Sequence, residues 1–352
     1  MLDTTQLLRQ MSEASGVSGY ERPVRAIVQE AFAPRADEVR QDALGNLIAL
    51  KRGTVDQGAH RRSIMLAAHM DEIGLMITGF EKGFLRFTTV GGVDLRTILG
   101  QEVTVHGRRD LVGIVASRPP HVLSAEARKK AIPLDQMYLD VGLSEDVVRE
   151  LVRVGDLVTL RREFLELAEG FVSGKAFDDR AGVASLAVCL EELAALQHSW
   201  DVYAVATTQE EVGLRGAMVS AYGLAPHIAI AVDVGFGAQQ GVPEHRTIAM
   251  KGGPAIAIGP NIHPAMHKRL LEVAKRYEIP YQTEIIGGRS GTDAWAIQVA
   301  REGIPTGLLS IPLRYMHTSV ETLSIQDIER TGRLMARFIG ELDEAFAQEL
   351  GI

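Results

Sequence analysis

Four short apolar runs in this 352-residue chain each lead into polar side chains that suit metal or proton chemistry. They are residues 64–68 before His69 and Asp71, 202–206 before Glu210-Glu211, 228–232 before Asp233, and 307–311 before His317. Such uninterrupted runs are typical of strands buried on both faces, as in a parallel sheet. In an open α/β sheet, ligands bind outside the carboxyl ends of the strands. We therefore expect these polar groups to converge at one edge of a sheet.

The two ends of the chain predict an α/β fold. Residues 1–60 predict an amphipathic helix, a second helix that begins near Arg22-Pro23, and a strand at 46–50. From about residue 170 onward, strands alternate with helices in the pattern of an open, mostly parallel sheet with helices on both faces. The stretch from 325 to 347 predicts one final amphipathic helix.

The stretch between these parts has a different pattern. Residues 75–165 contain short β-type runs separated by glycine, and a segment from 118 to 133 predicts an exposed loop with a short helix at most. We therefore expect an all-β domain, residues 75–165, inserted into a discontinuous α/β domain formed by residues 1–74 and 166–352.

Composition excludes several classes of function. The hydrophobic share of 46% and the charged share of 23% are typical of a soluble globular protein. A net charge of −8 disfavours binding to nucleic acid, and no apolar run reaches the length of a membrane span. Because residues 1–6 lack a basic segment followed by an apolar one, we expect a cytoplasmic location. The single cysteine, Cys189, lies in an apolar helical run and is predicted to be buried and inert.

A fifth polar group, Asp178-Asp179, precedes a predicted helix that continues to Leu196. Taken singly, each group has an ordinary structural explanation. An acidic pair before a helix commonly caps it, a histidine after a strand is commonly a hydrogen-bonded loop residue, and adjacent glutamates commonly lie on the surface. Together, two histidines and four carboxylates at the ends of sheet elements or a helix form a nitrogen and oxygen ligand set suited to zinc, cobalt or manganese.

With these residues in view, the sequence resembles the TET-type metallo-aminopeptidases, a family that includes glutamyl, leucyl and deblocking aminopeptidases. The resemblance covers essentially the whole chain and rests on six ordered motifs. They are Ala68-His69-Met70-Asp71-Glu72-Ile73-Gly74, Lys175-Ala176-Phe177-Asp178-Asp179-Arg180, Thr208-Gln209-Glu210-Glu211-Val212-Gly213, Val232-Asp233-Val234-Gly235, Gly291-Thr292-Asp293-Ala294 and Pro312-Leu313-Arg314-Tyr315-Met316-His317.

The resemblance implies roles for individual residues. Asp178 would bridge two divalent metal ions. Zinc or cobalt is the main expectation, and manganese is the alternative. His69 and Asp233 would complete the site of one ion, and Glu211 and His317 the site of the other. Asp71 would orient His69. The wider group of two-metal exopeptidases also implies a cis peptide bond between Asp178 and Asp179.

The implied activity is removal of N-terminal residues from peptides. A water that bridges the ions would attack the scissile carbonyl, and Glu210 would act as general base and return the proton to the leaving amine. The implied fold is a zinc-exopeptidase-like α/β domain interrupted by a PDZ-like or barrel module that drives dimerisation. Assembly of such dimers into a tetrahedral homododecamer would admit unfolded peptides and exclude folded proteins.

Three other functions remain as alternatives. A deacylase or carboxypeptidase could use the same two-metal scaffold. A glycosidase could use Glu210 and Glu211 as its carboxylate pair, although it would leave His69, Asp178, Asp233 and His317 without a role. A non-catalytic assembly protein could retain the fold without the activity.

Overall fold

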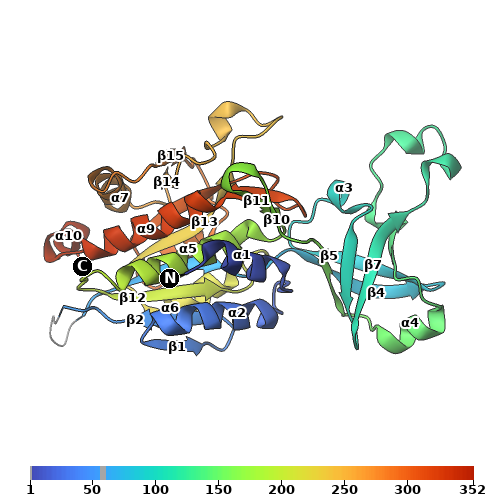
Figure 1. Ribbon diagram of the computed structural model, residues 1–352, viewed down its shortest axis with the longest axis horizontal. Coiled ribbons are helices and arrows are strands. Elements are labelled where there is room, and N and C mark those ends of the chain that lie inside the picture. Colours follow the sequence, from blue (N-terminus) through green and yellow to red (C-terminus); the bar gives the residue numbers. More distant parts are fainter. Residues whose placement is uncertain (1, 56–60) are drawn as a thin grey trace.

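The structure, a computed structural model, describes residues 2–55 and 61–352. It has an α/β part and a β-barrel, which lie next to each other along the long axis of the molecule (Figure 1). Both chain ends lie in the α/β part, and the barrel strands come from the middle of the sequence.

An eight-stranded mixed sheet forms the centre of the α/β part. In spatial order its strands are β1 Glu38–Gln41, β2 Leu47–Lys51, β12 Asp201–Thr207, β3 Ser63–His69, β13 Ile228–Phe236, β16 Thr306–Leu313, β14 Ala255–Ile258 and β15 Gln282–Ile285. The four central strands β12, β3, β13 and β16 are mutually parallel and correspond to the four apolar runs. Antiparallel pairs, β1 with β2, β2 with β12 and β14 with β16, flank this parallel centre.

Helices cover both faces of this sheet, because its central strands are apolar on both sides. Side chains of β3 show the alternation: Ile64, Leu66 and Ala68 pack into one core, and Met65 and Ala67 into the other. The first core is covered by α1 Thr4–Glu13, α2 Arg22–Phe32, α5 Phe177–Leu193, α7 Pro264–Arg276, α9 Ile325–Gly340 and α10 Glu344–Leu350; the second is covered by α6 Arg215–Leu224 and α8 Asp293–Gln298. The predicted fold class is confirmed.

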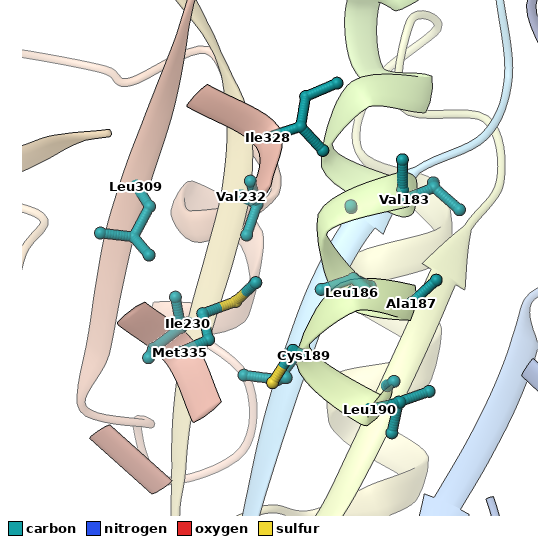
Figure 2. Packing of buried hydrophobic residues seen from close by; sticks show 14 of the residues in the cluster. Val183, Leu186, Ala187, Cys189, Leu190, Ile230, Val232, Leu309, Ile328 and Met335 are labelled. Carbon is teal, nitrogen blue, oxygen red and sulfur yellow. The ribbon is translucent and has the colours of Figure 1, made fainter. Parts of the chain in front are cut away.

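Helix α5 runs through the larger of these two cores. Figure 2 shows Cys189 on this helix among apolar side chains that include Ile230 of β13 and Met335 of α9. The thiol is fully buried, and burial raises its pKa, which keeps it in the unreactive protonated form. The prediction of a buried, inert cysteine is confirmed.

The middle of the chain forms a closed six-stranded barrel. Its strands, in order around the barrel, are β4 Gly74–Glu81, β5 Phe84–Val90, β8 Met137–Asp140, β7 Asp110–Ser117, β6 Glu102–His106 and β9 Leu157–Leu160. The barrel has a separate apolar core that includes Leu75, Leu85 and Val103. The expectation of an all-β stretch is wrong in detail, because α3 Leu95–Ile98 and α4 Glu145–Leu151 lie between these strands. Val148 of α4 packs into the barrel core.

A small third sheet connects the barrel to the α/β part. It consists of β10 Leu165–Glu166, β11 Phe171–Gly174 and β17 Glu321–Ser324. Strand β11 leads directly into the N-terminus of α5, and β17 follows the loop that carries His317. This sheet therefore brings two of the predicted site segments together.

Short 3₁₀ turns complete the secondary structure, at Ala33–Arg35, Pro120–Val122, Ala127–Lys129, Leu134–Gln136, Ala168–Gly170 and Glu244–Arg246. The single helix predicted for residues 325–347 is wrong, because the chain divides it into α9 and α10. Asp343 lies between them and caps α10 by accepting a hydrogen bond from the backbone N–H of Phe346. Within residues 2–55 and 61–352, none of the helices combines the length and the apolar character that crossing a membrane requires.

Candidate metal centre

The predicted site residues come from five separated segments and meet at the carboxyl edge of the parallel strands. His69 is the last residue of β3, and Asp233 lies in the second half of β13. Asp178 lies in the first turn of α5, Glu211 in the turn after β12, and His317 in the loop after β16. Parallel strands end at the same edge of a sheet, which explains how groups so far apart in sequence converge.

Five of these residues form two groups that share one aspartate. Potential ligand atoms of His69, Asp178 and Asp233 lie within 4.8 Å of one another, and so do those of Asp178, Glu211 and His317. The two carboxylate oxygens of Asp178 face different histidines. Its Oδ1 lies 3.1 Å from Nε2 of His69, and its Oδ2 lies 3.1 Å from Nε2 of His317. A carboxylate in this position can bridge two cations.

The backbone around Asp178 is held by a residue that the sequence did not single out. The peptide bond between Asp178 and Asp179 is cis, as predicted. Oε2 of the buried Glu321, at the start of β17, accepts hydrogen bonds from the backbone N–H groups of Phe177 and Asp178, at 2.7 and 3.1 Å. Its Oε1 accepts one from the backbone N–H of His317 at 2.8 Å. One carboxylate thus fixes two of the predicted site residues.

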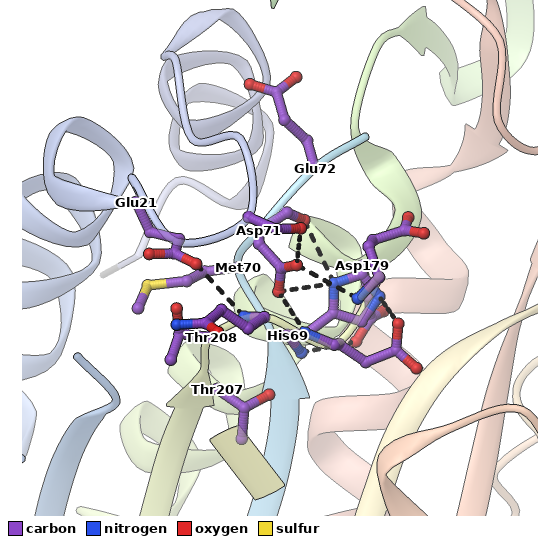
Figure 3. A network of polar contacts seen from close by, with 12 residues as sticks. Glu21, His69, Met70, Asp71, Glu72, Asp179, Thr207 and Thr208 are labelled. Carbon is purple, nitrogen blue, oxygen red and sulfur yellow. Dashed lines mark hydrogen bonds and ion pairs between the residues drawn. The ribbon is translucent and has the colours of Figure 1, made fainter. Parts of the chain in front are cut away.

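Asp71 connects the segment of His69 to the two glutamates, and Figure 3 shows Asp71 beside His69 within a network of polar contacts. Its carboxylate accepts hydrogen bonds from the backbone N–H groups of Glu210 and Glu211, at 3.0 and 3.2 Å, and from the hydroxyl of Ser18 at 2.6 Å. The atom of Asp71 nearest to the imidazole is its backbone oxygen, 3.2 Å from Nδ1 of His69. A donor Nδ1–H in that contact leaves Nε2 of His69 free to face Asp178.

A buried network of ion pairs holds Glu72, which follows Asp71 in the chain. Oε2 of Glu72 lies 2.7 Å from Nζ of Lys175, and its Oε1 lies 3.2 Å from the guanidinium of Arg180. All three side chains are buried. Burial lowers the pKa of Lys175 to about 8, against the opposing effect of Glu72. These residues belong to the recognised motifs, but sequence spacing gave no sign of their pairing.

The carboxylates of the site have too few positive partners within the protein. Burial raises the pKa of Glu210 to about 10 and that of Glu211 to about 7, and it also raises the pKa of Asp233. Within the described part of the chain, no lysine or arginine lines this pocket. Buried acids without cationic partners are costly. Each group offers one imidazole and two carboxylates, which suits zinc, cobalt or manganese, so the residues fit a pair of divalent ions.

The pocket above the two groups is small. It has a volume of about 260 Å³, below the roughly 300–1,000 Å³ of sites that take drug-sized ligands. Besides the predicted site residues, its lining includes the side chains of Phe236, Glu284, Thr292 and Met316. Asp293, whose charge acts on Glu210, is buried, and its Oδ2 accepts a hydrogen bond from the hydroxyl of Thr207 at 2.5 Å.

The chain next to the barrel also reaches the site. The backbone oxygen of Gly92, just after β5, lies 3.0 Å from Nδ1 of His317. A Cβ atom at Gly91 would lie 3.3 Å from the Cβ of Glu211. Ser319 donates a hydrogen bond at 3.0 Å to the side chain of Gln101, which precedes β6. The group that contains Glu211 and His317 is therefore bounded on one side by the barrel segment.

The chain is similar to known aminopeptidases over nearly its whole length. The chain is 37% identical over 346 residues to the lysyl aminopeptidase of Pyrococcus furiosus, covering 96% of this chain and 97% of that one. A TET aminopeptidase from the marine sediment archaeon Thaumarchaeota archaeon SCGC AB-539-E09 superposes with a TM-score of 0.92 at 33% identity, over 99% and 98% of the two chains. The TET1 peptidase of Pyrococcus horikoshii, which can assemble into a tetrahedron or a large octahedral shell, superposes with a TM-score of 0.84 at 32% identity, over 97% and 100%.

The family assignment follows from these matches. Residues 45–334 match the family described as M42 glutamyl aminopeptidase. The predicted resemblance to TET-type aminopeptidases and the predicted enzyme class, a hydrolase that acts on peptide bonds as an exopeptidase, are confirmed. The chain belongs to the M42 glutamyl aminopeptidase family.

Proposed function

We propose that this chain is a two-metal aminopeptidase that removes single residues from the N-termini of peptides. His69, Asp178 and Asp233 hold one divalent ion, and Asp178, Glu211 and His317 hold the other. The observation that carries the proposal is the position of Asp178, whose two carboxylate oxygens each lie 3.1 Å from a different histidine. Zinc or cobalt fits the donor set best, and manganese also fits. Bound there, the ions supply Lewis acidity that polarises a scissile carbonyl and makes water more acidic.

In this proposal Glu210 acts as the general base. Glu210 is buried and lines the pocket, and it belongs to neither of the two groups that would hold the ions. Its Oε2 lies 3.8 Å from Nε2 of His69. The hydrogen bond from its backbone N–H to Asp71 fixes the turn that carries it. Glu210 takes a proton from the attacking water and delivers it to the amine that leaves.

Asp71 and Glu321 position the other groups. Asp71 holds the backbone of Glu210 and Glu211, and its carbonyl oxygen orients the ring of His69. Glu321 holds the backbone of Asp178 and His317. Groups that orient ligands in this way are commonly worth about 10- to 100-fold in metal affinity or activity.

We further propose that residues 75–165 form a domain that drives assembly, with dimers as the building unit of a tetrahedral homododecamer. Three apolar side chains on the barrel support this proposal: Val112 and Ile114 on β7 are 53% and 46% exposed, and Val122 in the following loop is 68% exposed. Val112 and Ile114 lie two residues apart and therefore on the same face of β7, and exposed apolar residues that share a face are typical of interaction surfaces. The tetrahedral assembly of the Pyrococcus horikoshii relative favours the same geometry. The cytoplasmic location stays a prediction.

The roles of the two neighbouring glutamates provide the main test. Glu210→Gln keeps the shape of the side chain but removes the proton acceptor, so both ions should remain bound while turnover falls about 10²- to 10⁴-fold. Glu211→Gln replaces an anionic ligand by a neutral amide, so metal content should fall together with turnover. The measurement is metal stoichiometry beside turnover for each purified variant. Equal metal loss in both variants, or a fully active Glu210→Gln enzyme, would overturn these roles.

A second experiment separates the aminopeptidase from a deacylase or a carboxypeptidase on the same scaffold. The metal-loaded enzyme is given one peptide with a free N-terminus and the same peptide with an acetylated N-terminus. An aminopeptidase releases the first residue of the free peptide only. Release of acetate, or of the C-terminal residue, would instead assign one of the alternative activities.

A further inference from the structure

One carboxylate in the pocket has no role in the chemistry described so far. Glu284, in the edge strand β15, is partly buried and lines the pocket together with Asp233, Phe236 and Met316. Its Oε2 accepts a hydrogen bond from the hydroxyl of Ser310 at 2.5 Å. Burial raises the pKa of Glu284, and the hydrogen bond from Ser310 lowers it again only in part. Among the residues that the structure describes, no lysine or arginine shares this pocket with it.

The backbone places this carboxylate close to the candidate metal centre. Ser310, its hydrogen-bond donor, is the register partner of Asp233 on the neighbouring parallel strand. Gly235 lies two residues beyond Asp233 on the same face of β13. A Cβ atom at Gly235 would lie 3.3 Å from Oε1 of Glu284, so the absence of a side chain there leaves room for the carboxylate. Glu284 is thus connected to the strand position beside Asp233 through Ser310.

The charges in the pocket leave Glu284 without a counter-ion. The lining contains five carboxylates, those of Asp178, Glu210, Glu211, Asp233 and Glu284, and two imidazoles. Two divalent ions held there would balance the first four of these carboxylates in their ionised form. The fifth, Glu284, has no cationic side chain beside it in the described pocket lining. A cationic partner would favour its ionised form and make a charge-assisted hydrogen bond, which is stronger in a partly desolvated site than in water. A positively charged group of the substrate is the partner that completes this arrangement.

We propose that Glu284 determines specificity by binding the positively charged side chain of an N-terminal lysine or arginine, so that the enzyme prefers peptides with basic N-terminal residues; this inference rests on the proposed aminopeptidase function. Phe236, which is 52% exposed, and Met316 offer apolar surface to the methylene groups of such a side chain. The carboxylate then receives the charged end.

The test is a comparison of kcat/KM for lysyl, leucyl and glutamyl chromogenic substrates. The metal-loaded wild-type enzyme should prefer the lysyl substrate. Glu284→Gln, which removes the charge and keeps the shape, should lower the ratio of lysyl to leucyl kcat/KM about 10- to 100-fold, the usual scale for a lost hydrogen bond between charged groups. Glu302→Gln, at an exposed position outside the pocket, is the matched control and should leave the ratio unchanged.

A second variant keeps the test valid if Glu284→Gln does not fold. Ser310→Ala removes the hydrogen bond that positions the carboxylate and should lower the same ratio by a smaller factor. An equal loss of activity on the lysyl and leucyl substrates would mean that Glu284 binds the α-ammonium group common to both, which contradicts the proposal. An unchanged ratio, or a wild-type preference for the glutamyl or leucyl substrate, would also contradict it. A wild-type enzyme inactive on all three substrates would reject the proposed function itself.

Discussion

The two candidate metal groups share Asp178 but differ in how the protein holds them. In the first group, His69 and Asp233 belong to central parallel strands and are buried. In the second, Glu211 and His317 lie in loops, and the side chain of His317 is 31% exposed. A position on a buried strand is fixed by the sheet itself, whereas a position on a loop depends on the hydrogen bonds that hold the loop.

This difference locates the part of the site that is open to adjustment. The second group depends on Glu321, on Asp71 and on the barrel segment at Gly92. The backbone of His317 also has a positive φ of 62°, which is uncommon for residues other than glycine. Loss of a distant contact should therefore weaken the second group more than the first.

The largest effect should come from the residue that both groups share. Asp178→Asn keeps the size of the side chain but replaces an anionic oxygen by an amide, so both ions should bind poorly. Turnover should fall by about 10³-fold or more, because each ion supplies several kcal/mol of transition-state stabilisation. Asp146→Asn, on an exposed face of α4, serves as the matched control. If Asp178→Asn retained both ions, Asp178 would not be the ligand that the two groups share.

Replacement of Glu321 should separate the two groups more finely. A glutamine has only one acceptor oxygen, so it cannot accept from Asp178 and His317 on both sides as the carboxylate does. We expect affinity for the ion at Glu211 and His317 to fall about 10- to 100-fold and turnover to fall with it. Metal titration of Glu321→Gln beside Glu150→Gln, an exposed control, checks this. Equal weakening of both ions would indicate that Glu321 acts mainly through Asp178.

Removal of metal from the wild-type enzyme should also show that the second group is the weaker one. Because His317 is partly exposed and His69 is buried, the ion of the second group should leave first when chelator is added. The two losses should occur at clearly different chelator concentrations. Activity should fall with the first loss. Simultaneous release of both ions at every chelator concentration would argue against distinct sites.

The smallest effect should come from the contact between the His317 loop and the barrel. Ser319→Ala removes the hydrogen bond to Gln101, which should lower turnover by a few-fold, and by about tenfold at most. The ion at His69 and Asp233 should stay bound with unchanged affinity. Steady-state kinetics and metal titration of this variant measure both quantities. A weakened first ion would show that the two groups are not held independently.

The sequence predicted the parts of the fold that local pattern determines. The four apolar runs became the four central parallel strands, because strands buried on both faces need uninterrupted apolar residues. The barrel strands were predicted as well, since glycine and alternating residues mark them. Helix α4 and the break between α9 and α10 were not predicted, because a short helix over a barrel and a cap such as Asp343 carry little periodic signal.

The site was predicted only as far as motifs and strand ends reach. His69, Asp178 and His317 were predicted as site residues because each follows or precedes a regular element, and the structure places Asp178 next to both histidines. Glu321 and Glu284 were missed, because a single acid in a short strand gives no local sign of the partners that it meets more than 20 residues away. Long-range contacts of this kind follow from the folded arrangement and not from spacing along the chain.

The measurement that tests the central claim most directly is the number of ions that the protein binds. Metal-free wild-type enzyme is titrated with zinc or cobalt, and bound metal per chain is counted while turnover is followed in the same samples. The proposed site predicts saturation at two ions per chain, with full activity only when both are bound. Saturation at one ion, or full activity with one ion bound, would contradict it.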